Sequence, residues 1–148
     1  MWGMPLPSLT SMWNKYPTGS AAAVKSKIGG NINMGWVTNT CVVRVSYCFN
    51  YCGEPIPARF AGMLTARGGD GKRYALRVSE FKPFLEKRYK AADINGASAS
   101  DFAGKTGIIM FNVSGWSDAT GHFDLWNGSS CRHAEYFGKS SSVHLWTC

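Results

Sequence analysis

The sequence lacks long hydrophobic runs. Nowhere in its 148 residues do about 18 apolar residues follow one another, so we predict no membrane-spanning segment. The opening stretch, MWGMPLPSLTSMWNKYP, has no basic start followed by an apolar core, so we predict no cleavable secretory leader. Repeats and linkers are also missing, and the length suits one hydrophobic core. We therefore expect a single domain over residues 1–148. If the protein is exported, we expect a route that does not use a cleavable leader.

Acidic residues are scarce. Nine Asp and Glu stand against sixteen Lys and Arg, which gives a net charge of +7. Such an excess favours an anionic partner, but the basic residues are scattered and no nucleic-acid-binding motif accompanies them. We therefore predict no nucleic acid as partner, and an anionic polymer such as bacterial cell wall is the alternative. The 45% hydrophobic content excludes a disordered chain.

Histidine is rare, with three residues, and the five cysteines lack the spacing of a zinc site. Zinc sites usually combine two paired elements, and only Cys48 and Cys52 form one, since Cys131 and His133 are too close together. We predict no metal. Because five is odd, four cysteines can pair while one stays a free thiol, and five buried thiols are the alternative.

The sequence pattern predicts helices first and strands later. Helices are predicted over 8–16, 20–30 and 79–90, with Ser8, Ser20 and Ser79 as their N-caps. Apolar runs bounded by turn residues predict strands over 72–78, 106–113, 121–128 and 141–148. This order is typical of an α+β fold with an antiparallel sheet.

Residues 41–52, CVVRVSYCFNYC, fit two structures. Apolar side chains alternate from Val43 to Phe49, as in a strand, but an apolar stripe at helical spacing is present as well. The β-branched content favours a strand, whereas the polar run at 38–40 suits a helix cap. The pattern alone does not decide between them.

Cys41 and His122 are the residues best suited to chemistry. A thiol is a strong nucleophile only as the thiolate, which a helix N-terminus and a nearby imidazolium both favour. Cys41 begins the ambiguous segment, and His122 begins a predicted strand. With a third polar group on the imidazole, the pair would form a nucleophilic catalyst. By pattern alone, two unrelated residues fit equally well.

Several segments together carry a family resemblance. They occur in the order IGGNI at 28–32, NTCVVRVSYCFN at 39–50, GEPIP at 53–57, DFAGKTGIIMF at 101–111, GWSDATGHFDLWNG at 115–128 and SSVHLW at 141–146. Over roughly residues 26–146 the chain resembles the type VI secretion amidase effectors of the fourth subfamily. That family is similar to NlpC-type papain-like cysteine peptidases.

The resemblance implies both a fold and a function. The implied fold is papain-like α+β, in which residues 41–52 form a central helix packed on an antiparallel sheet. The implied function is that of a toxin injected into rival Gram-negative bacteria. In their periplasm it would cut peptidoglycan stem peptides at the amide between D-glutamate and meso-diaminopimelate. A cognate immunity protein would protect the producer, and no cofactor is implied.

The resemblance also assigns roles to residues. Cys41 would attack the amide carbonyl as a thiolate and form an acyl-enzyme. His122 would act as general base, protonating the leaving amine and then activating water. The backbone N–H of Cys41, at the helix start, is the expected oxyanion donor.

The third catalytic residue departs from the family pattern. Members usually have an aspartate shortly after the LWNG turn, and this chain has His133 at that spacing. We therefore predict His133 as the third member, with Asp124 and Glu135 as alternatives. Asp124 lies two residues from His122 on the same strand face, so we expect it beside the ring more readily than behind it.

The other cysteines follow from this assignment. With Cys41 as the nucleophile, Cys131 and Cys148 bracket the last hairpin, and we predict a disulfide between them. A periplasmic site of action would permit such a bond. Cys48 and Cys52 lie one helical turn apart, and there we favour two buried thiols over a second bond.

Four residues are candidates for substrate binding: Trp36, Arg44, Trp116 and Asp118. Each has a structural alternative. The tryptophans fit core packing, Arg44 fits a salt bridge or a solvated side chain, and Asp118 fits a turn cap.

Two other functions compete with the toxin. One is a non-catalytic, basic and aromatic module that binds cell wall; its effect would survive Cys41→Ala and His122→Ala. The other is a housekeeping or host-acquired cell-wall hydrolase of the same fold. The absence of a leader and of wall-binding repeats from the sequence counts against a housekeeping hydrolase, which normally has a leader and often has such repeats.

Overall fold

Two short helices begin the fold, and each is capped by a serine. Ser8 and Ser20 accept hydrogen bonds from main-chain N–H groups one turn into α1 (Leu9–Lys15) and α2 (Ala21–Ile28). Helix α2 ends at Gly29, whose φ of 72° is readily adopted by glycine. Both helices and both caps confirm the predictions. The computed structural model describes residues 3–114 and 121–148 of the chain.

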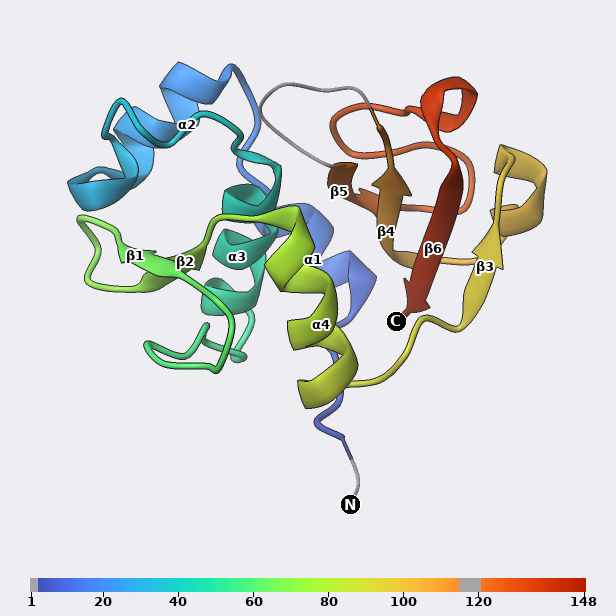
Figure 1. Cartoon of the computed structure of the whole chain (residues 1–148), viewed down its shortest axis with the longest axis horizontal. Helices are drawn as coiled ribbons and strands as arrows, with labels where there is room; N and C mark the ends of the chain where they lie inside the picture. The colour runs from blue at the N-terminus through green and yellow to red at the C-terminus, as the bar shows by residue number, and fades with distance from the viewer. Residues whose placement is uncertain (1–2, 115–120) are drawn as a thin grey trace.

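Helix α3 (Cys41–Tyr51) lies between α2 with the hairpin at 65–75 on one side and α1 with the helix that follows this hairpin on the other (Figure 1). Most of its residues are buried, so apolar side chains lie on several sides and fit the alternation of a strand as well as a helical stripe, which is why periodicity did not decide between them. The structure decides for the helix, as the resemblance implied. Its start is held by Asn39, whose side chain accepts the N–H of Cys41, while Thr40 makes no side-chain cap.

The main sheet has four antiparallel strands in the order β3-β6-β4-β5, which makes β5 an edge strand. Their bounds are β3 (Ile94–Gly96), β4 (Gly107–Asn112), β5 (Gly121–Trp126) and β6 (Ser142–Thr147). The register places Phe111 opposite His122 and Ile109 opposite Asp124. His122 and Asp124 therefore lie on the same face of the edge strand.

A hairpin and a helix connect α3 to the main sheet. Their bounds are β1 (Thr65–Arg67), β2 (Arg73–Ala75) and α4 (Val78–Arg88). The strand predicted over 72–78 ends early because α4 starts at Val78, and Ser79 is therefore inside the helix and not its cap. β1, β3 and the 3-10 turns η1 (Gly30–Ile32), η2 (Ala99–Phe102) and η3 (Phe137–Lys139) were not predicted, because three or four residues are too few to show a period.

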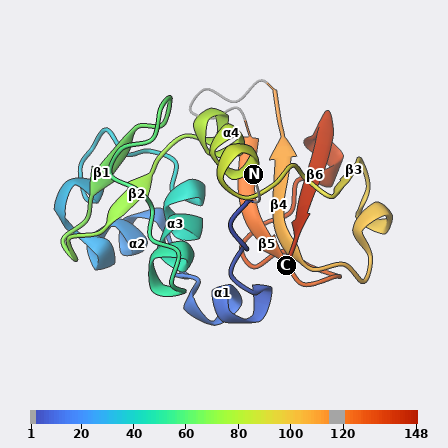
Figure 2. The same cartoon turned by 90° about the horizontal axis from the view of Figure 1, so that it is seen from below.

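The largest hydrophobic cluster lies between α1, α3, α4 and one face of the main sheet (Figures 1 and 2). Within it, the ring of Phe81 packs edge-on against Phe49 of α3 and Phe123 of β5. A second cluster joins α2 to the hairpin, and a third covers the opposite face of the sheet. This packing brings the start of α3 beside the edge strand β5. None of the described helices combines the length and apolar character needed to cross a membrane.

All five cysteines lie within the described residues, and all are free thiols. The predicted disulfide between Cys131 and Cys148 is wrong. Cys148 packs against the main core on one face of the sheet, whereas Cys131 packs against the cluster on the other face. Cys48 and Cys52 are separate thiols, as favoured, but only Cys48 is buried, whereas Cys52 is half-buried. The Cys48 thiol donates to the carbonyl of Met12 at 3.3 Å.

Candidate active site

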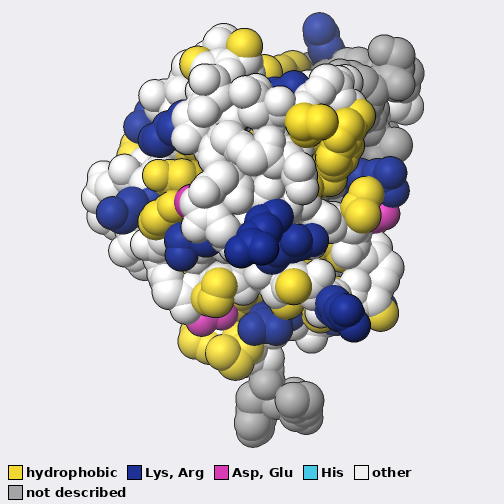
Figure 3. Space-filling view, turned by 90° about the vertical axis from the view of Figure 1, so that its left-hand side faces the viewer, with side chains coloured by type: hydrophobic (Ala, Val, Ile, Leu, Met, Phe, Trp, Pro, Cys, Tyr) yellow, Lys and Arg dark blue, Asp and Glu magenta, His cyan; other side chains and the backbone are white. Residues whose placement is uncertain are grey.

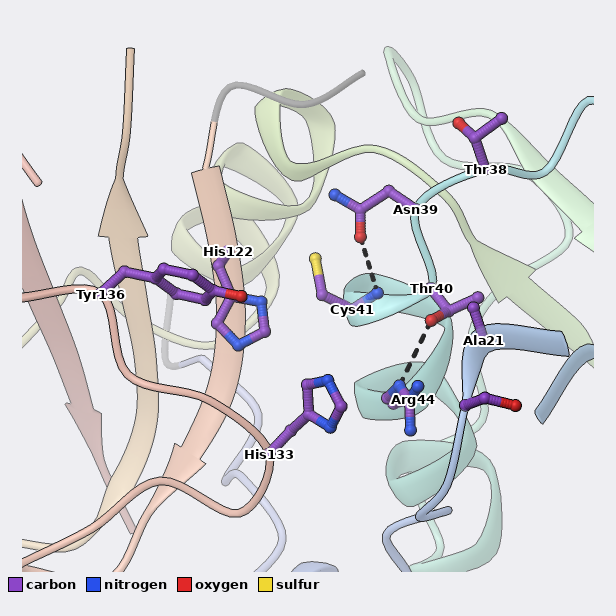
Figure 4. Close-up of a pocket in the computed structure, with 10 residues that line it drawn as sticks. Ala21, Thr38, Asn39, Thr40, Cys41, Arg44, His122, His133 and Tyr136 are labelled. Atoms are coloured by element: carbon purple, nitrogen blue, oxygen red, sulfur yellow. Dashed lines mark hydrogen bonds between the residues drawn. The ribbon is translucent and has the colours of Figure 1, made fainter. Parts of the chain in front are cut away.

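Cys41 is the first residue of α3 and lies at the wall of a cavity (Figure 4). Its main-chain N–H donates to Oδ1 of Asn39 at 3.0 Å. Helix N-termini favour negative charge because their N–H groups and dipole point outward. The position therefore suits a thiolate.

His122 faces Cys41 from the edge strand β5 and is also buried. Its Nε2 lies 2.7 Å from Oδ2 of Asp124, which leaves Nδ1 for the sulfur. Burial alone lowers the pKa of His122, but the hydrogen bonds to Asp124 and Cys41, with their charges, raise it to about 9. The imidazole therefore lies between the carboxylate of Asp124 and the sulfur, the position of a base that receives a thiol proton.

Asp124 is fully buried and its carboxylate is held by the main chain. The carboxylate accepts the N–H groups of Leu125 at 2.7 Å, Ala134 at 2.9 Å and His133 at 3.1 Å. These bonds fix the oxygen that meets His122, so the orientation of the ring is determined by a rigid partner.

His133, predicted as the third member, does not hydrogen-bond to the ring of His122, which pairs with Asp124 instead. Its main chain, and not its ring, reaches this position, because its N–H donates to Asp124. The ring centroids of His133 and His122 are 6.2 Å apart, and the ring of His133 faces the cavity. Burial first, and then the charge of Arg44, lowers the pKa of His133. The other alternative, Glu135, accepts the N–H of Cys131 at 3.1 Å instead.

The cavity between α2, α3 and β5 has a volume of about 490 Å³. Its lining comprises Ser20, Ala21, Thr38, Asn39, Thr40, Cys41, Arg44, His122, His133 and Tyr136 (Figure 4). Sequence reasoning missed Tyr136, whose ring lies 5.0 Å from that of His122, since no motif contains it. It also recognised Asn39 only as part of a polar run.

Arg44 is neither solvated nor part of an ion pair with any described residue, so both structural alternatives are wrong. Its side chain is 2% exposed. The guanidinium donates to Thr40 Oγ1 at 3.3 Å and to the carbonyls of Pro17 at 3.0 Å and Gly19 at 2.9 Å. Arg44 therefore ties α3 to the connection between α1 and α2, at the wall of the cavity. Its role in substrate binding stays a prediction.

Trp36 is 55% exposed, which excludes the core-packing alternative. It lines a smaller cavity of about 140 Å³ that shares Thr38 and Asn39 with the larger one. The two cavities therefore adjoin at Thr38 and Asn39, between Trp36 and Cys41. The other two candidates, Trp116 and Asp118, lie outside the described residues.

The arrangement suits nucleophilic acyl transfer. A thiol at a helix start, an imidazole and a buried carboxylate occur in the order that a cysteine nucleophile, a base and an orienting group require. Within residues 3–114 and 121–148, no three His, Cys, Asp or Glu side chains gather into a possible metal site.

Comparison with known proteins agrees with this geometry. Residues 37–146 match the family model of type VI secretion system (T6SS) amidase effector protein 4, Tae4. The effector Tae4 from Salmonella typhimurium, solved with the immunity protein Tai4 from Enterobacter cloacae, is 33% identical, with a TM-score of 0.90 over 96% of this chain and 99% of that one. Tae4 from Enterobacter cloacae is 35% identical, with a TM-score of 0.89 over 99% of both chains.

The comparison with curated proteins found no match. The family model nevertheless spans well over half of the chain, and the solved effectors match it along almost its whole length. The predicted resemblance and the papain-like α+β fold are confirmed. The chain therefore belongs to the type VI secretion system amidase effector protein 4 family.

Proposed function

We propose that this amidase effector hydrolyses the amide between D-glutamate and meso-diaminopimelate in peptidoglycan stem peptides, with Cys41, His122 and Asp124 as its catalytic groups. The observation that carries the proposal is the 2.7 Å bond from His122 to Asp124, in a cavity whose opposite wall is Cys41. Family membership supports the reaction class, and the resemblance supports the bond that is cut.

The proposed reaction has two stages. His122 takes the proton of Cys41, and the thiolate attacks the amide carbonyl of the glutamyl group. His122 then protonates the leaving amine as the C–N bond breaks, which leaves a thioester. Water, deprotonated by His122, attacks the thioester and regenerates the thiol. Asp124 keeps the imidazole oriented and stabilises its charged form through both stages.

Substrate binding is proposed along the surface between Trp36 and Arg44. Exposed aromatic rings suit the flat faces of sugars or peptides, and a guanidinium suits a stem-peptide carboxylate. The face carrying α2 and the β1–β2 hairpin adds long-range attraction, because Lys and Arg side chains gather there with few acidic ones (Figure 3). Helix α2 contains Lys25 and Lys27, and the hairpin contains Arg67 and Lys72. A basic face attracts an anionic wall.

The site of action we propose is the periplasm of the target cell, where peptidoglycan is accessible. The solved relatives occur in complexes with the immunity protein Tai4, so we propose a cognate immunity protein for this chain as well. We also propose that residues 1–148 act as one amidase domain. The contacts of α3 with both the hairpin and β5 support this, since they join the two parts of the fold.

Purified muropeptides test the proposal. The wild-type chain is expected to release products cut between D-glutamate and diaminopimelate, as read by mass spectrometry. Cys41→Ala and His122→Ala are expected to abolish this cleavage. Cys52→Ala and His144→Ala are matched controls outside the cavity, and they should cleave like the wild type. Intact muropeptides with wild-type protein, or cleavage by Cys41→Ala, would refute it.

A further inference from the structure

Asn39 occupies a special position between the helix start and the cavity. Its Oδ1 accepts the main-chain N–H of Cys41 at 3.0 Å, which identifies the other end of the amide as the NH₂ group. Among the described residues, no acceptor bonds to Nδ2. Figure 4 shows this nitrogen on the side of the cavity where the sulfur of Cys41 lies. The two N–H groups of Nδ2 are therefore available to a ligand.

The main-chain N–H of Cys41, which the sequence suggested as the oxyanion donor, already has a hydrogen-bond acceptor. The N–H of Cys41 has its acceptor in Asn39, so a carbonyl oxygen at Cys41 cannot use it without displacing that amide. An amidase nevertheless needs a donor about 2.7–3.1 Å from the developing oxyanion. The side chain of Asn39 thus occupies the expected donor, the Cys41 N–H, through Oδ1 and offers another donor through Nδ2.

We propose that the Nδ2 group of Asn39 is the oxyanion donor of this amidase. The assignment rests on the proposed acyl transfer at Cys41. When the thiolate forms its bond to the carbonyl carbon, the C=O electron pair moves onto oxygen, and Nδ2–H donates to that oxygen. The pair returns as the C–N bond breaks and His122 protonates the amine. The Cys41 N–H bound to Oδ1 polarises the amide and strengthens this donation.

A simpler role for Asn39 is to cap α3 and position Cys41. The two roles differ in which reactions of the sulfur they affect. Acylation passes through a tetrahedral oxyanion, whereas alkylation by iodoacetamide displaces iodide directly and forms none. A lost oxyanion donor therefore slows acylation alone, while a displaced or poorly oriented sulfur slows both reactions.

The test uses Asn39→Asp, which keeps an oxygen acceptor for the Cys41 N–H and removes both N–H donors. Acylation is measured with muropeptide and with p-nitrophenyl acetate, and alkylation with iodoacetamide at a pH where its rate has levelled off. The variant is expected to lose about 10²–10³-fold in acylation rate and to keep its alkylation rate and Tm. Asn14→Asp, an exposed asparagine of α1, is the charge-matched control.

Two other outcomes of the Asn39→Asp test each overturn the assignment. Acylation by Asn39→Asp at the wild-type rate would show that Nδ2 donates to nothing in the transition state. A parallel fall in acylation and alkylation would show that Asn39 only positions the sulfur. Failure of the wild type to cut muropeptides would instead refute the proposed function, while the ester reaction would still test Asn39.

Discussion

Nε2 of His122 lies 2.7 Å from Oδ2 of Asp124, two residues further along the same edge strand. Side chains at positions i and i+2 share one face of a strand, so Asp124 reaches the ring from beside it. The carboxylate is turned toward the ring by the main-chain N–H groups of Leu125, His133 and Ala134. This geometry leaves Nδ1 of His122 for the sulfur.

Replacing Asp124 by asparagine is expected to lower kcat by on the order of 10²–10⁴-fold, the range for a positioned proton-transfer group. The amide has no charge to stabilise an imidazolium, and its NH₂ end forces the wrong ring tautomer. The pKa of His122, about 9 with Asp124 present, should fall, and the alkaline limb of kcat/KM should move to lower pH. Rates across pH check this; an unmoved limb would contradict it.

Replacing His133 by alanine is expected to reduce activity far less than Asp124→Asn. Its ring makes no hydrogen bond to His122, and its main-chain N–H, which alanine retains, supplies the contact to Asp124. The change should therefore appear in KM more than in kcat, and the pH profile should keep its shape. A loss of kcat as large as that of Asp124→Asn would restore His133 as the orienting residue.

The stability of the protein is expected to depend on His122 between about pH 6.5 and 9. Its pKa is raised to about 9 from 6.5, so the folded state holds the proton more tightly than the unfolded chain. The stabilisation is complete below pH 6.5 and is lost as pH rises through 9. Urea unfolding at pH 6 and pH 9.5 should show a larger drop in unfolding free energy for the wild type than for His122→Ala.

The comparison with His122→Ala is essential because other groups act in the same direction. Burial raises the pKa of the Cys48 and Cys131 thiols and that of Cys148 to about 11, so the unfolded chain loses these protons first as the pH rises. Those thiols lower stability at high pH in both proteins. Only the difference between the two proteins reports on His122, and equal drops would mean that its pKa is not raised.

The sequence predicted the site in part, and the misses have physical causes. Cys41 and His122 were candidates because they begin a possible helix and a predicted strand, and the family resemblance, not the pattern, assigned their roles. The third residue was misjudged because spacing says which loop passes the site but not whether its main chain or side chain faces it. His133 does reach the predicted place, with its N–H in contact with Asp124.

The fold shows the same division between local and tertiary information. Serine caps and glycine stops act within a few residues, so α1 and α2 were predicted together with their ends. The identity of α3 depends on burial on nearly all sides, a tertiary property that periodicity does not contain. The pairing of Cys131 with Cys148 failed likewise, because the pattern does not tell which sheet face each thiol meets.

All five cysteines are expected to react with a thiol reagent after denaturation without a reductant. Cys131 and Cys148 lie on opposite faces of the main sheet, so no disulfide joins them in the folded protein. Mass spectrometry of protein alkylated in urea should therefore show five modified thiols. The melting temperature should also be the same with and without reductant. Three modified thiols in protein purified without reductant would contradict this expectation.

Arg44→Met separates two roles of the guanidinium. The carbonyls of Pro17 and Gly19 lose their donors. That of Pro17 is buried, and an unsatisfied buried polar group costs about 1–3 kcal/mol, so the unfolding free energy should fall. If Arg44 also binds the free α-carboxylate of D-glutamate, the variant should lose activity on that substrate but not on its amidated counterpart. Arg44→Lys keeps the positive charge but not the planar set of guanidinium donors, so its stability and activity are expected to lie between those of the wild type and Arg44→Met. Urea unfolding measures the change in stability, and KM for the two substrates measures the change in binding. Equal losses of activity on both substrates would show that Arg44 has a structural role alone.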